Sequence, residues 1–176
     1  MQQIASARAP SVVHVISDAG PHPYFTTLIE AGGFPRDRLT VGCVGPAGPL
    51  QHEMARLGVA SFALDASRRD RYPLAVVRLA RLLRHDRVQV VQTHLVDGCL
   101  VGLAAARLAR TPVTVMTAHH SHELPFHGPR LRWSERLSGG PLSDRVIAPS
   151  LQVARTLERL ANVPAVKIEV VHHGFD

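Results

Sequence analysis

The chain has 176 residues, 45% of them hydrophobic, and carries a formal net charge of +6 at pH 7. This length and composition suit one globular domain with a sizeable core and exclude a disordered chain. Aromatic residues make up only 5% of the chain, and no recognition-helix, RNA-binding or zinc-finger motif accompanies the positive charge. We therefore expect no nucleic-acid partner.

Short segments rich in valine alternate with helical segments along the whole chain. This alternation predicts an α/β fold, a Rossmann-like doubly wound parallel sheet of about six or seven strands with helices on both faces. No linker divides the sequence, so residues 1–176 are expected to form a single domain. The expected strands are Ser11–Ser17, Arg38–Gly45, Val59–Leu64, Val88–His94, Pro112–His119, Arg145–Ala148 and Lys167–Val171. The expected helices are Tyr24–Ala31, Leu50–Leu57, Pro73–Arg84, Gly98–Ala109, Leu131–Leu137 and Leu151–Ala161.

Three features of the sequence indicate a cytoplasmic location. Cys43 and Cys99 lie in apolar surroundings and are interpreted as reduced core residues, not as a disulfide. The first apolar run, Val12–Ile16, is too short for a signal peptide and contains His14. No apolar run approaches the roughly 20 residues that a membrane span needs.

An arginine-rich face is expected on one helix. Arg78, Arg81 and Arg84 lie three residues apart and so share one side of the expected helix Pro73–Arg84. Such a face is either simply solvated or a peripheral contact with anionic lipid headgroups at the inner membrane face, or with a phosphorylated acceptor.

Polar residues and glycines follow several expected strands, where open α/β sheets bind their ligands. Gly20 lies in a tight turn after the first strand, which can present backbone N–H groups to an anion or be an ordinary turn. His94 ends the fourth strand, and His119 ends the fifth. Ser150 precedes a helix and is expected to cap it.

Four histidines crowd the segment after the fifth strand. Such a cluster raises the question of a zinc site, but no acidic or cysteine partner has a recognisable ligand spacing, and the segment is not a helix with an H-E-x-x-H motif. We therefore expect no metal and no cofactor, and interpret the segment as a loop on the acceptor side. The histidines are His119, His120, His122 and His127.

Several motifs of the second half resemble the first domain of two-domain, GT-B type glycosyltransferases of the family 4-like group. Thr117–His119 matches the T-x-H segment of that group, Thr93–Leu95 its strand-end histidine, and Val146–Ser150 its VIAxS segment. His172–Asp176 matches its NG-hydrophobic-D turn, with histidine in place of asparagine. From Ser11 to Asp86 the resemblance rests mainly on the order of elements, and the G-G-x-E-like segment of the group is not present.

The resemblance implies the acceptor side of an enzyme of the hexosyltransferase type. Such an enzyme transfers a sugar from a nucleotide-sugar donor to the hydroxyl of a carbohydrate, lipid-linked or small-molecule acceptor, with retention of anomeric configuration. It implies that His119 is catalytic and faces the donor sugar, and that Gly20, His94 and His120 bind substrate. A structural histidine bonded to a backbone carbonyl is an equally open interpretation of His94.

The resemblance also implies a partner domain. In the resembled group the nucleotide is held mainly by a C-terminal domain with an E-x7-E segment, and no such segment is identified here. We therefore expect that the donor-binding domain is absent from the chain and that this half alone is inactive. Two other interpretations remain: a stand-alone binding module or acceptor subunit of a split enzyme, and half of a GT-B-shaped nucleotide-sugar epimerase.

Overall fold

The computed structural model describes residues 10–32, 34–119 and 129–172. The strands are β1 (Val12–Ile16), β2 (Leu39–Cys43), β3 (Ala60–Ala63), β4 (Val90–His94), β5 (Val113–Thr117), β6 (Arg145–Ala148) and β7 (Ile168–Val170). The α-helices are α1 (Pro23–Glu30), α2 (Pro49–Arg56), α3 (Tyr72–His85), α4 (Val96–Ala109), α5 (Pro129–Gly139) and α6 (Leu151–Ala161). Short 3-10 turns cover Arg36–Arg38, Arg69–Arg71 and Ala165–Lys167.

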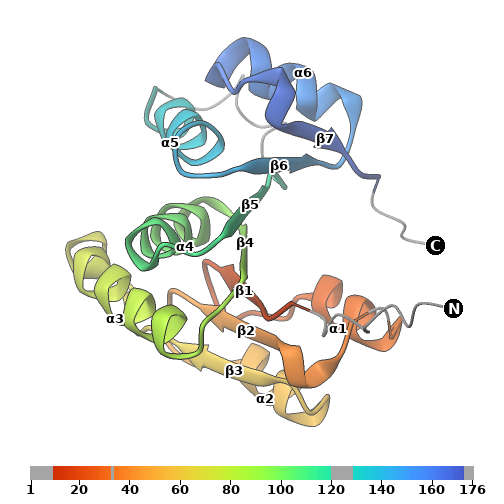
Figure 1. Ribbon diagram of the computed structural model, residues 1–176, viewed down its shortest axis with the longest axis vertical. Helices are drawn as coiled ribbons and strands as arrows, with labels where there is room; N and C mark the ends of the chain where they lie inside the picture. Colours follow the sequence, from red (N-terminus) through yellow and green to blue (C-terminus); the bar gives the residue numbers. More distant parts are fainter. Residues whose placement is uncertain (1–9, 33, 120–128, 173–176) are drawn as a thin grey trace, which may run out of the picture.

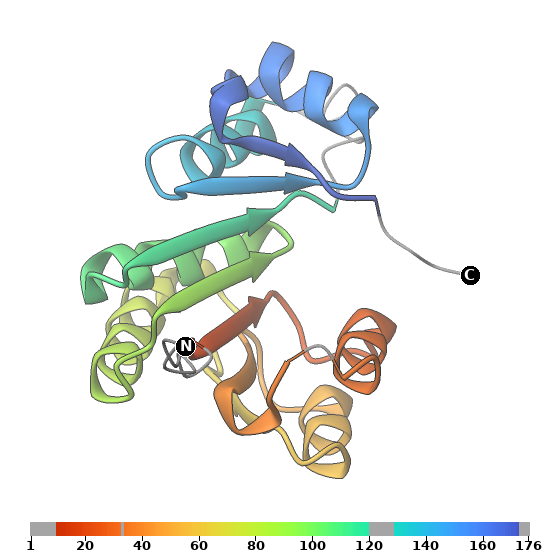
Figure 2. The ribbon, with the colours of Figure 1, turned by 45° about the vertical axis from the view of Figure 1, so that its right-hand side comes forward.

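The seven strands form one parallel sheet in the order β3-β2-β1-β4-β5-β6-β7. The order reverses between β1 and β4, which is the topological switch point of a doubly wound fold. Helices α1 and α2 lie on one side of the sheet, and α3, α4 and α5 lie on the other (Figures 1 and 2). Helices α3, α4, α5 and α6 pack against one another in succession. The predicted fold class is confirmed.

The expected element boundaries differ from the observed ones by a few residues. Helices α1 and α2 begin one residue early, at Pro23 and Pro49, because proline needs no hydrogen-bonded N–H in the first turn. Strand β5 ends at Thr117 and not at His119, because the His119 N–H turns back to donate to the Thr117 carbonyl at 3.2 Å. A 3-10 turn, Arg69–Arg71, directly precedes α3.

Two glycines let α4 lie directly on the sheet. A Cβ atom added to Gly98 would lie 2.9 Å from the backbone of Ile16, and one added to Gly102 would lie 2.7 Å from the Thr93 methyl group. The Gly98 N–H also donates to Ser17 Oγ at 3.0 Å. Because these residues belong to the ends of β1 and β4, the position of α4 fixes the edge of the sheet at the switch point.

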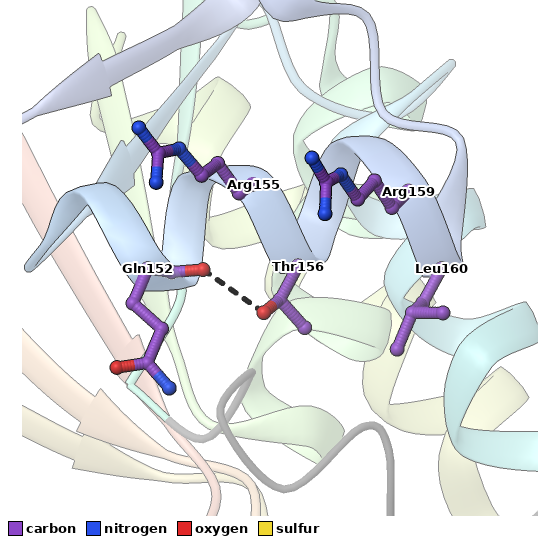
Figure 3. Close-up of a pocket in the computed structure, with 5 residues that line it drawn as sticks. All are labelled: Gln152, Arg155, Thr156, Arg159 and Leu160. Carbon is purple, nitrogen blue, oxygen red and sulfur yellow. Dashed lines mark hydrogen bonds between the residues drawn. The ribbon is translucent and has the colours of Figure 1, made fainter.

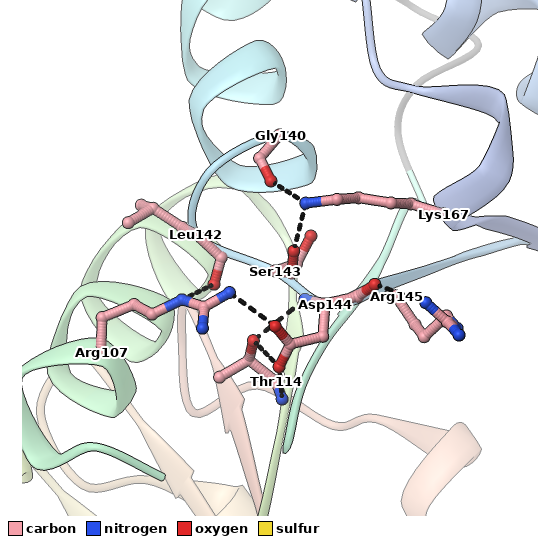
Figure 4. Close-up of polar contacts among 8 residues, drawn as sticks. All are labelled: Arg107, Thr114, Gly140, Leu142, Ser143, Asp144, Arg145 and Lys167. Carbon is pink, nitrogen blue, oxygen red and sulfur yellow. Dashed lines mark hydrogen bonds and ion pairs between the residues drawn. The ribbon is translucent and has the colours of Figure 1, made fainter. Parts of the chain in front are cut away.

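A polar network joins α4, β5 and the segment before β6 (Figure 4). Asp144 Oδ2 accepts hydrogen bonds from the Thr114 N–H and hydroxyl, both at 2.8 Å, and Asp144 Oδ1 accepts from Arg107 at 2.8 Å. Lys167 donates to the Ser143 carbonyl at 2.8 Å and to the Gly140 carbonyl. Partial burial works against the charge of Asp144, but the bonds from Arg107 and Thr114 outweigh it and hold the pKa of this carboxyl below its usual value.

The expectations for the two cysteines and for Ser150 are confirmed. Cys43 and Cys99 are buried free thiols. Ser150 caps α6, since its hydroxyl accepts a hydrogen bond from the Val153 N–H at 3.2 Å. Gly58 follows α2 with a φ of +69°, a conformation that favours glycine. No helix within residues 10–32, 34–119 and 129–172 has the length and apolarity to cross a membrane.

A candidate active site at the switch point

Three histidines from neighbouring strands form a continuous hydrogen-bonded chain. His14 Nδ1 lies 2.9 Å from His94 Nε2, and His94 Nδ1 lies 2.9 Å from His119 Nε2. His14 is central in β1, His94 is the last residue of β4, and His119 follows β5. Because β1, β4 and β5 are adjacent, the chain of rings runs across the switch point at the carboxyl edge of the sheet. We refer to these three residues as the histidine chain.

The histidine chain runs from the core towards the surface. His14 and His94 are 3% and 1% exposed, whereas His119 is half-buried. Burial lowers the pKa of His14 from 6.5 to about 4, so this ring is neutral at physiological pH. A neutral imidazole has one N–H donor and one acceptor nitrogen, so His14 can pair with His94 without carrying a buried charge.

Two aromatic residues of α1 pack against the histidine chain. Phe25 packs edge-on against His14 and His94, with ring centroids 5.5 and 5.3 Å apart. Tyr24 contacts His94 and His119 at 5.3 and 5.8 Å. Burial raises the pKa of Tyr24, and a hydrogen bond with Gln92 offsets part of this effect. These contacts restrict how the imidazole rings can turn.

A cavity of about 480 Å³ opens beside the exposed end of the histidine chain, and we call it the histidine pocket. Its lining includes Leu95, a residue with a φ of 60° that is unusual for a branched side chain. Strain of this kind concentrates at functional sites. The histidine pocket is lined by Ile16, His22, Pro23, Tyr24, Phe25, His94, Leu95 and His119.

A larger neighbouring cavity of about 960 Å³ lies between α4 and α5, and we call it the tryptophan pocket. Leu95 lines the histidine pocket and the next two residues line this one, so the two cavities adjoin at the first turn of α4. Asp97 Oδ1 and Arg69 face each other at 3.8 Å, and Trp133 is 62% exposed. The tryptophan pocket is lined by Arg69, Val96, Asp97, Leu100, Pro129, Arg130, Leu131, Trp133 and Ser134.

A shallow hollow along α6 is of a different kind. Its lining residues all come from this one helix, and Arg155 and Arg159 extend from it in the same direction (Figure 3). Thr156 donates a hydrogen bond to the Gln152 carbonyl at 2.9 Å, as a helical threonine commonly does. We assign no binding role to this surface. The lining residues are Gln152, Arg155, Thr156, Arg159 and Leu160.

The structure brings together only some of the residues that the sequence singled out. His94 and His119 are bonded to each other, and His94 also bonds to His14. Gly20 lies in the β1–α1 loop, where its N–H donates to Asp18 Oδ1 at 2.9 Å. His120 lies outside the described residues.

The zinc site considered from the sequence would use His119, His120, His122 and His127, and three of these four follow His119 in the same segment as His120. His122 and His127 also lie outside the described residues. Within the part of the chain that the structure describes, no group of three or more histidine, cysteine, aspartate or glutamate side chains is placed to hold a metal ion.

The sequence did not lead us to expect His14, Tyr24 or Phe25 in the site. His14 interrupts an apolar strand, and a polar side chain buried in a central strand needs a hydrogen-bond partner. Side chains alternate between the faces of a strand, and β1 and β4 flank the switch point. These two facts together point to the histidine that ends β4, so a signal for the pair was present in the sequence.

Comparisons with known proteins agree with this architecture. The model of the Glycosyltransferase Family 4 matches residues 13–176. A search among curated proteins found no match to the sequence.

Several solved structures share the fold at low sequence identity. The structure of Anabaena Alr3699/HepE in complex with UDP and glucose has a TM-score of 0.74 and 18% identity, over 96% of this chain and 45% of that one. The lipopolysaccharide outer core galactosyltransferase WaaB has a TM-score of 0.68 and 12% identity, over 93% and 46%. The UDP-GlcNAc 2-epimerase from Neisseria meningitidis bound to UDP-GlcNAc has a TM-score of 0.62 and 14% identity, over 90% and 46%.

The comparisons differ in what they establish. At these identities the solved structures show the fold alone, which the galactosyltransferase and the epimerase share. This chain spans slightly less than half the length of each. The family match covers nearly the whole sequence, so the chain belongs to the Glycosyltransferase Family 4.

Proposed function

We propose that this domain forms the acceptor side of a glycosyltransferase that moves a hexose from a nucleotide-sugar donor to an acceptor hydroxyl, with retention of anomeric configuration. The observation that carries the proposal is the position of His119 at the switch point. Its Nε2 lies 2.9 Å from His94 Nδ1, so the imidazole of His119 is held in place by its neighbour. A cavity adjoins this ring at the edge where open α/β sheets bind ligands.

We propose that the acceptor binds in the tryptophan pocket. An aromatic ring can pack on the C–H face of a sugar, a carboxylate can accept hydrogen bonds from hydroxyls, and guanidinium groups bind phosphate. Trp133, Asp97 and the pair Arg69 and Arg130 supply these three chemistries. This combination fits a carbohydrate acceptor that carries a phosphate, free or lipid-linked.

The donor is proposed to bind between this domain and a second domain that holds most of its nucleotide. Three of the solved structures with this fold contain UDP, UDP with glucose, or UDP-glucose, and each is about twice the length covered here.

A cytoplasmic location with peripheral membrane contact is also proposed. Arg78 and Arg81 are exposed on α3 beside Leu74 and Val77, which are 53% and 37% exposed.

Replacement of His119 tests the proposed function. In an enzyme that joins this domain to its donor-binding domain, we expect His119→Ala to lower kcat by roughly one to three orders of magnitude, the range found for lost transition-state donors. His85→Ala is the control, because His85 is an exposed histidine at the end of α3. Unchanged turnover per folded molecule for His119→Ala would refute the catalytic role.

Replacement of Asp97 tests the acceptor site separately. We expect Asp97→Asn to raise the KM for the acceptor about tenfold, the size of one charge-assisted hydrogen bond, with little change in the KM for the donor. Asp86→Asn, at an exposed aspartate after α3, should leave both constants unchanged. An equal rise in both KM values would argue against the tryptophan pocket as the acceptor site.

A further inference from the structure

One face of the domain presents large apolar side chains to solvent. Helices α3, α4 and α5 lie side by side on one side of the sheet, with α4 in the middle (Figures 1 and 2). We call the outer surface of these three helices the α3–α5 face. Its exposed apolar side chains are Leu74 and Val77 of α3, Leu108 of α4 and Trp133 of α5. Apolar side chains that gather on one surface indicate a site of interaction.

The charge of the α3–α5 face has one sign. Helices α3 and α5 carry three arginines each, α3 has no acidic residue, and the only acidic residue of α5, Glu135, is buried. Arg84 donates to the Leu108 carbonyl and so joins α3 to α4. Among the described residues the other five guanidinium groups have no ion pair or hydrogen bond, whereas Arg56 of α2 pairs with two glutamates. The five are Arg78, Arg81, Arg130, Arg132 and Arg136, all exposed.

The tryptophan pocket opens within this face. Its lining comes from α4, α5 and the turn before α3, and includes Arg130 and Trp133. Trp133 also lines a smaller hollow of about 200 Å³ at the end of α5, together with Arg136, Leu137 and Pro141. The indole therefore stands on the rim of the pocket, and a partner that covers the α3–α5 face also lies at the mouth of the pocket.

An anionic phospholipid bilayer matches this combination of groups. Unpaired guanidinium groups bind lipid phosphates, and the long side chains of arginine can reach the headgroups from a helix that lies on the membrane. Tryptophan is favoured at the depth of the headgroups, where its ring meets apolar groups and its N–H meets polar ones. Leu74 and Val77 can enter the boundary of the acyl chains. A soluble polyanion would match the charge but would gain nothing from these apolar side chains.

We propose that the domain lies on an anionic phospholipid bilayer through the α3–α5 face, with Trp133 at the level of the headgroups and the mouth of the tryptophan pocket against them. This extends the membrane contact proposed above from α3 to α5 and fixes the orientation of the pocket. The consequence for the acceptor rests on the proposed function. In this orientation the tryptophan pocket receives the phosphorylated sugar of a lipid-linked acceptor from the bilayer, and not a free sugar from water.

The fluorescence of the 176-residue chain tests the orientation, because Trp133 is its only tryptophan. We expect the emission to shift to shorter wavelength when vesicles of equal parts phosphatidylglycerol and phosphatidylcholine are added. Vesicles of phosphatidylcholine alone should cause little shift. Phosphatidylcholine brominated near the glycerol end of its acyl chains should quench Trp133 when it is mixed into the anionic vesicles.

Replacement of arginines tests which surface binds. Each basic residue near an anionic membrane strengthens binding by a factor of about five. We therefore expect Arg78→Gln with Arg81→Gln to weaken binding to the anionic vesicles roughly 25-fold, and Arg132→Gln with Arg136→Gln to do the same. Sedimentation of the chain with the vesicles measures both affinities. All four side chains are exposed, so the fold should be unaffected.

A pair of arginines outside the α3–α5 face provides the matched control. Arg155→Gln with Arg159→Gln removes the same charge from exposed, equally unpaired arginines of α6 and should weaken binding much less. An equal loss in this control would mean that net charge alone attracts the domain, which overturns the proposal. Failure to bind the anionic vesicles also overturns it, as does binding that leaves the emission of Trp133 unchanged.

None of these measurements requires sugar transfer, so the two proposals can fail separately. If the vesicles bind as expected but the enzyme joined to its donor-binding domain transfers no sugar, the proposed function falls and the α3–α5 face stands. If sugar is transferred but Trp133 is not quenched by the brominated lipid, the proposed function stands and the orientation on the bilayer falls.

Discussion

At the scale of single residues, His14 makes the stability of this domain depend on pH. Its pKa is 6.5 in an unfolded chain and about 4 in the fold because of burial, and the titratable group that faces it is His94, while α1 contributes Phe25. Between these two pKa values the unfolded state binds more protons than the folded state. The free energy of unfolding therefore falls as pH is lowered from about 6.5 towards 4.

The corresponding prediction compares the free energy of unfolding of wild type and His14→Phe between pH 7 and pH 4. A pKa shift of this size is worth about 3 kcal/mol, so the wild type should lose up to about this much between pH 7 and pH 4. Urea unfolding of wild type and His14→Phe at both pH values measures it. The loss should be smaller in His14→Phe by about the same amount, and parallel pH profiles would contradict the burial of a neutral His14.

How far the sequence predicts the site is also decided by individual residues. His94 and His119 are predictable because each ends a strand at the edge where ligands bind. The bond between them is not, because it depends on Tyr24 and Phe25, which arrive from α1 and fix the rings. The occupied N–H of Gly20 depends in the same way on the rotamer of Asp18, which the sequence leaves open.

At the scale of elements, α4 is the helix whose placement matters most for the site. Gly98→Ala would force a Cβ atom to within 2.9 Å of the Ile16 backbone, which cannot move aside like a flexible side chain. We expect a loss of about 1–3 kcal/mol in the free energy of unfolding, as for other overpacked positions. Gly45→Ala is the matched control, since its Cβ would lie at an ordinary 3.5 Å from the Ser17 carbonyl and should cost much less.

The polar network before β6 leads to a second prediction about stability, which concerns Asp144. Asp144→Asn should lower the free energy of unfolding by about 1 kcal/mol near neutral pH, since Arg107 and Asp144 are both partly exposed. The pKa of Asp144 is lowered in the fold, so its contribution is complete above 3.8 and is lost as pH falls through the lower folded-state pKa.

Thermal unfolding of both proteins at several pH values measures this contribution. The difference between wild type and Asp144→Asn should shrink as pH falls below 3.8. Asp86→Asn, from the exposed His85–Asp86 pair, should show no difference at any pH. A gap that stays constant at low pH would mean that the carboxylate charge does not stabilise the network.

The elements themselves could be predicted almost completely, for two physical reasons. Valine-rich strands buried on both faces give a strong signal, and proline, serine and glycine mark helix ends by their backbone chemistry. Arg145–Ala148 and Leu151–Ala161 have the expected bounds. The errors lie at ends set by tertiary contacts, as at His119, whose N–H turns back to Thr117.

At the scale of the whole molecule, the sheet presents one carboxyl edge with two adjoining cavities at its switch point. The chain spans slightly less than half the length of each of the three solved structures compared above. The proposed function therefore divides the substrates, with the acceptor on this domain and most of the nucleotide on another. This division leads to a prediction about the 176-residue chain by itself.

We expect the 176-residue chain alone to show no sugar transfer and to bind UDP-sugars more weakly than micromolar. Micromolar affinity corresponds to about 8 kcal/mol, which is more than a donor should gain from one side of its binding cleft. Calorimetry with UDP-glucose and with UDP, together with an assay for sugar transfer, measures both expectations. Addition of a donor-binding domain should restore transfer, and His119→Ala in that assembly should abolish most of it. Micromolar binding of UDP-glucose by the chain alone would show that the nucleotide is held here, and the division of substrates between two domains would have to be abandoned.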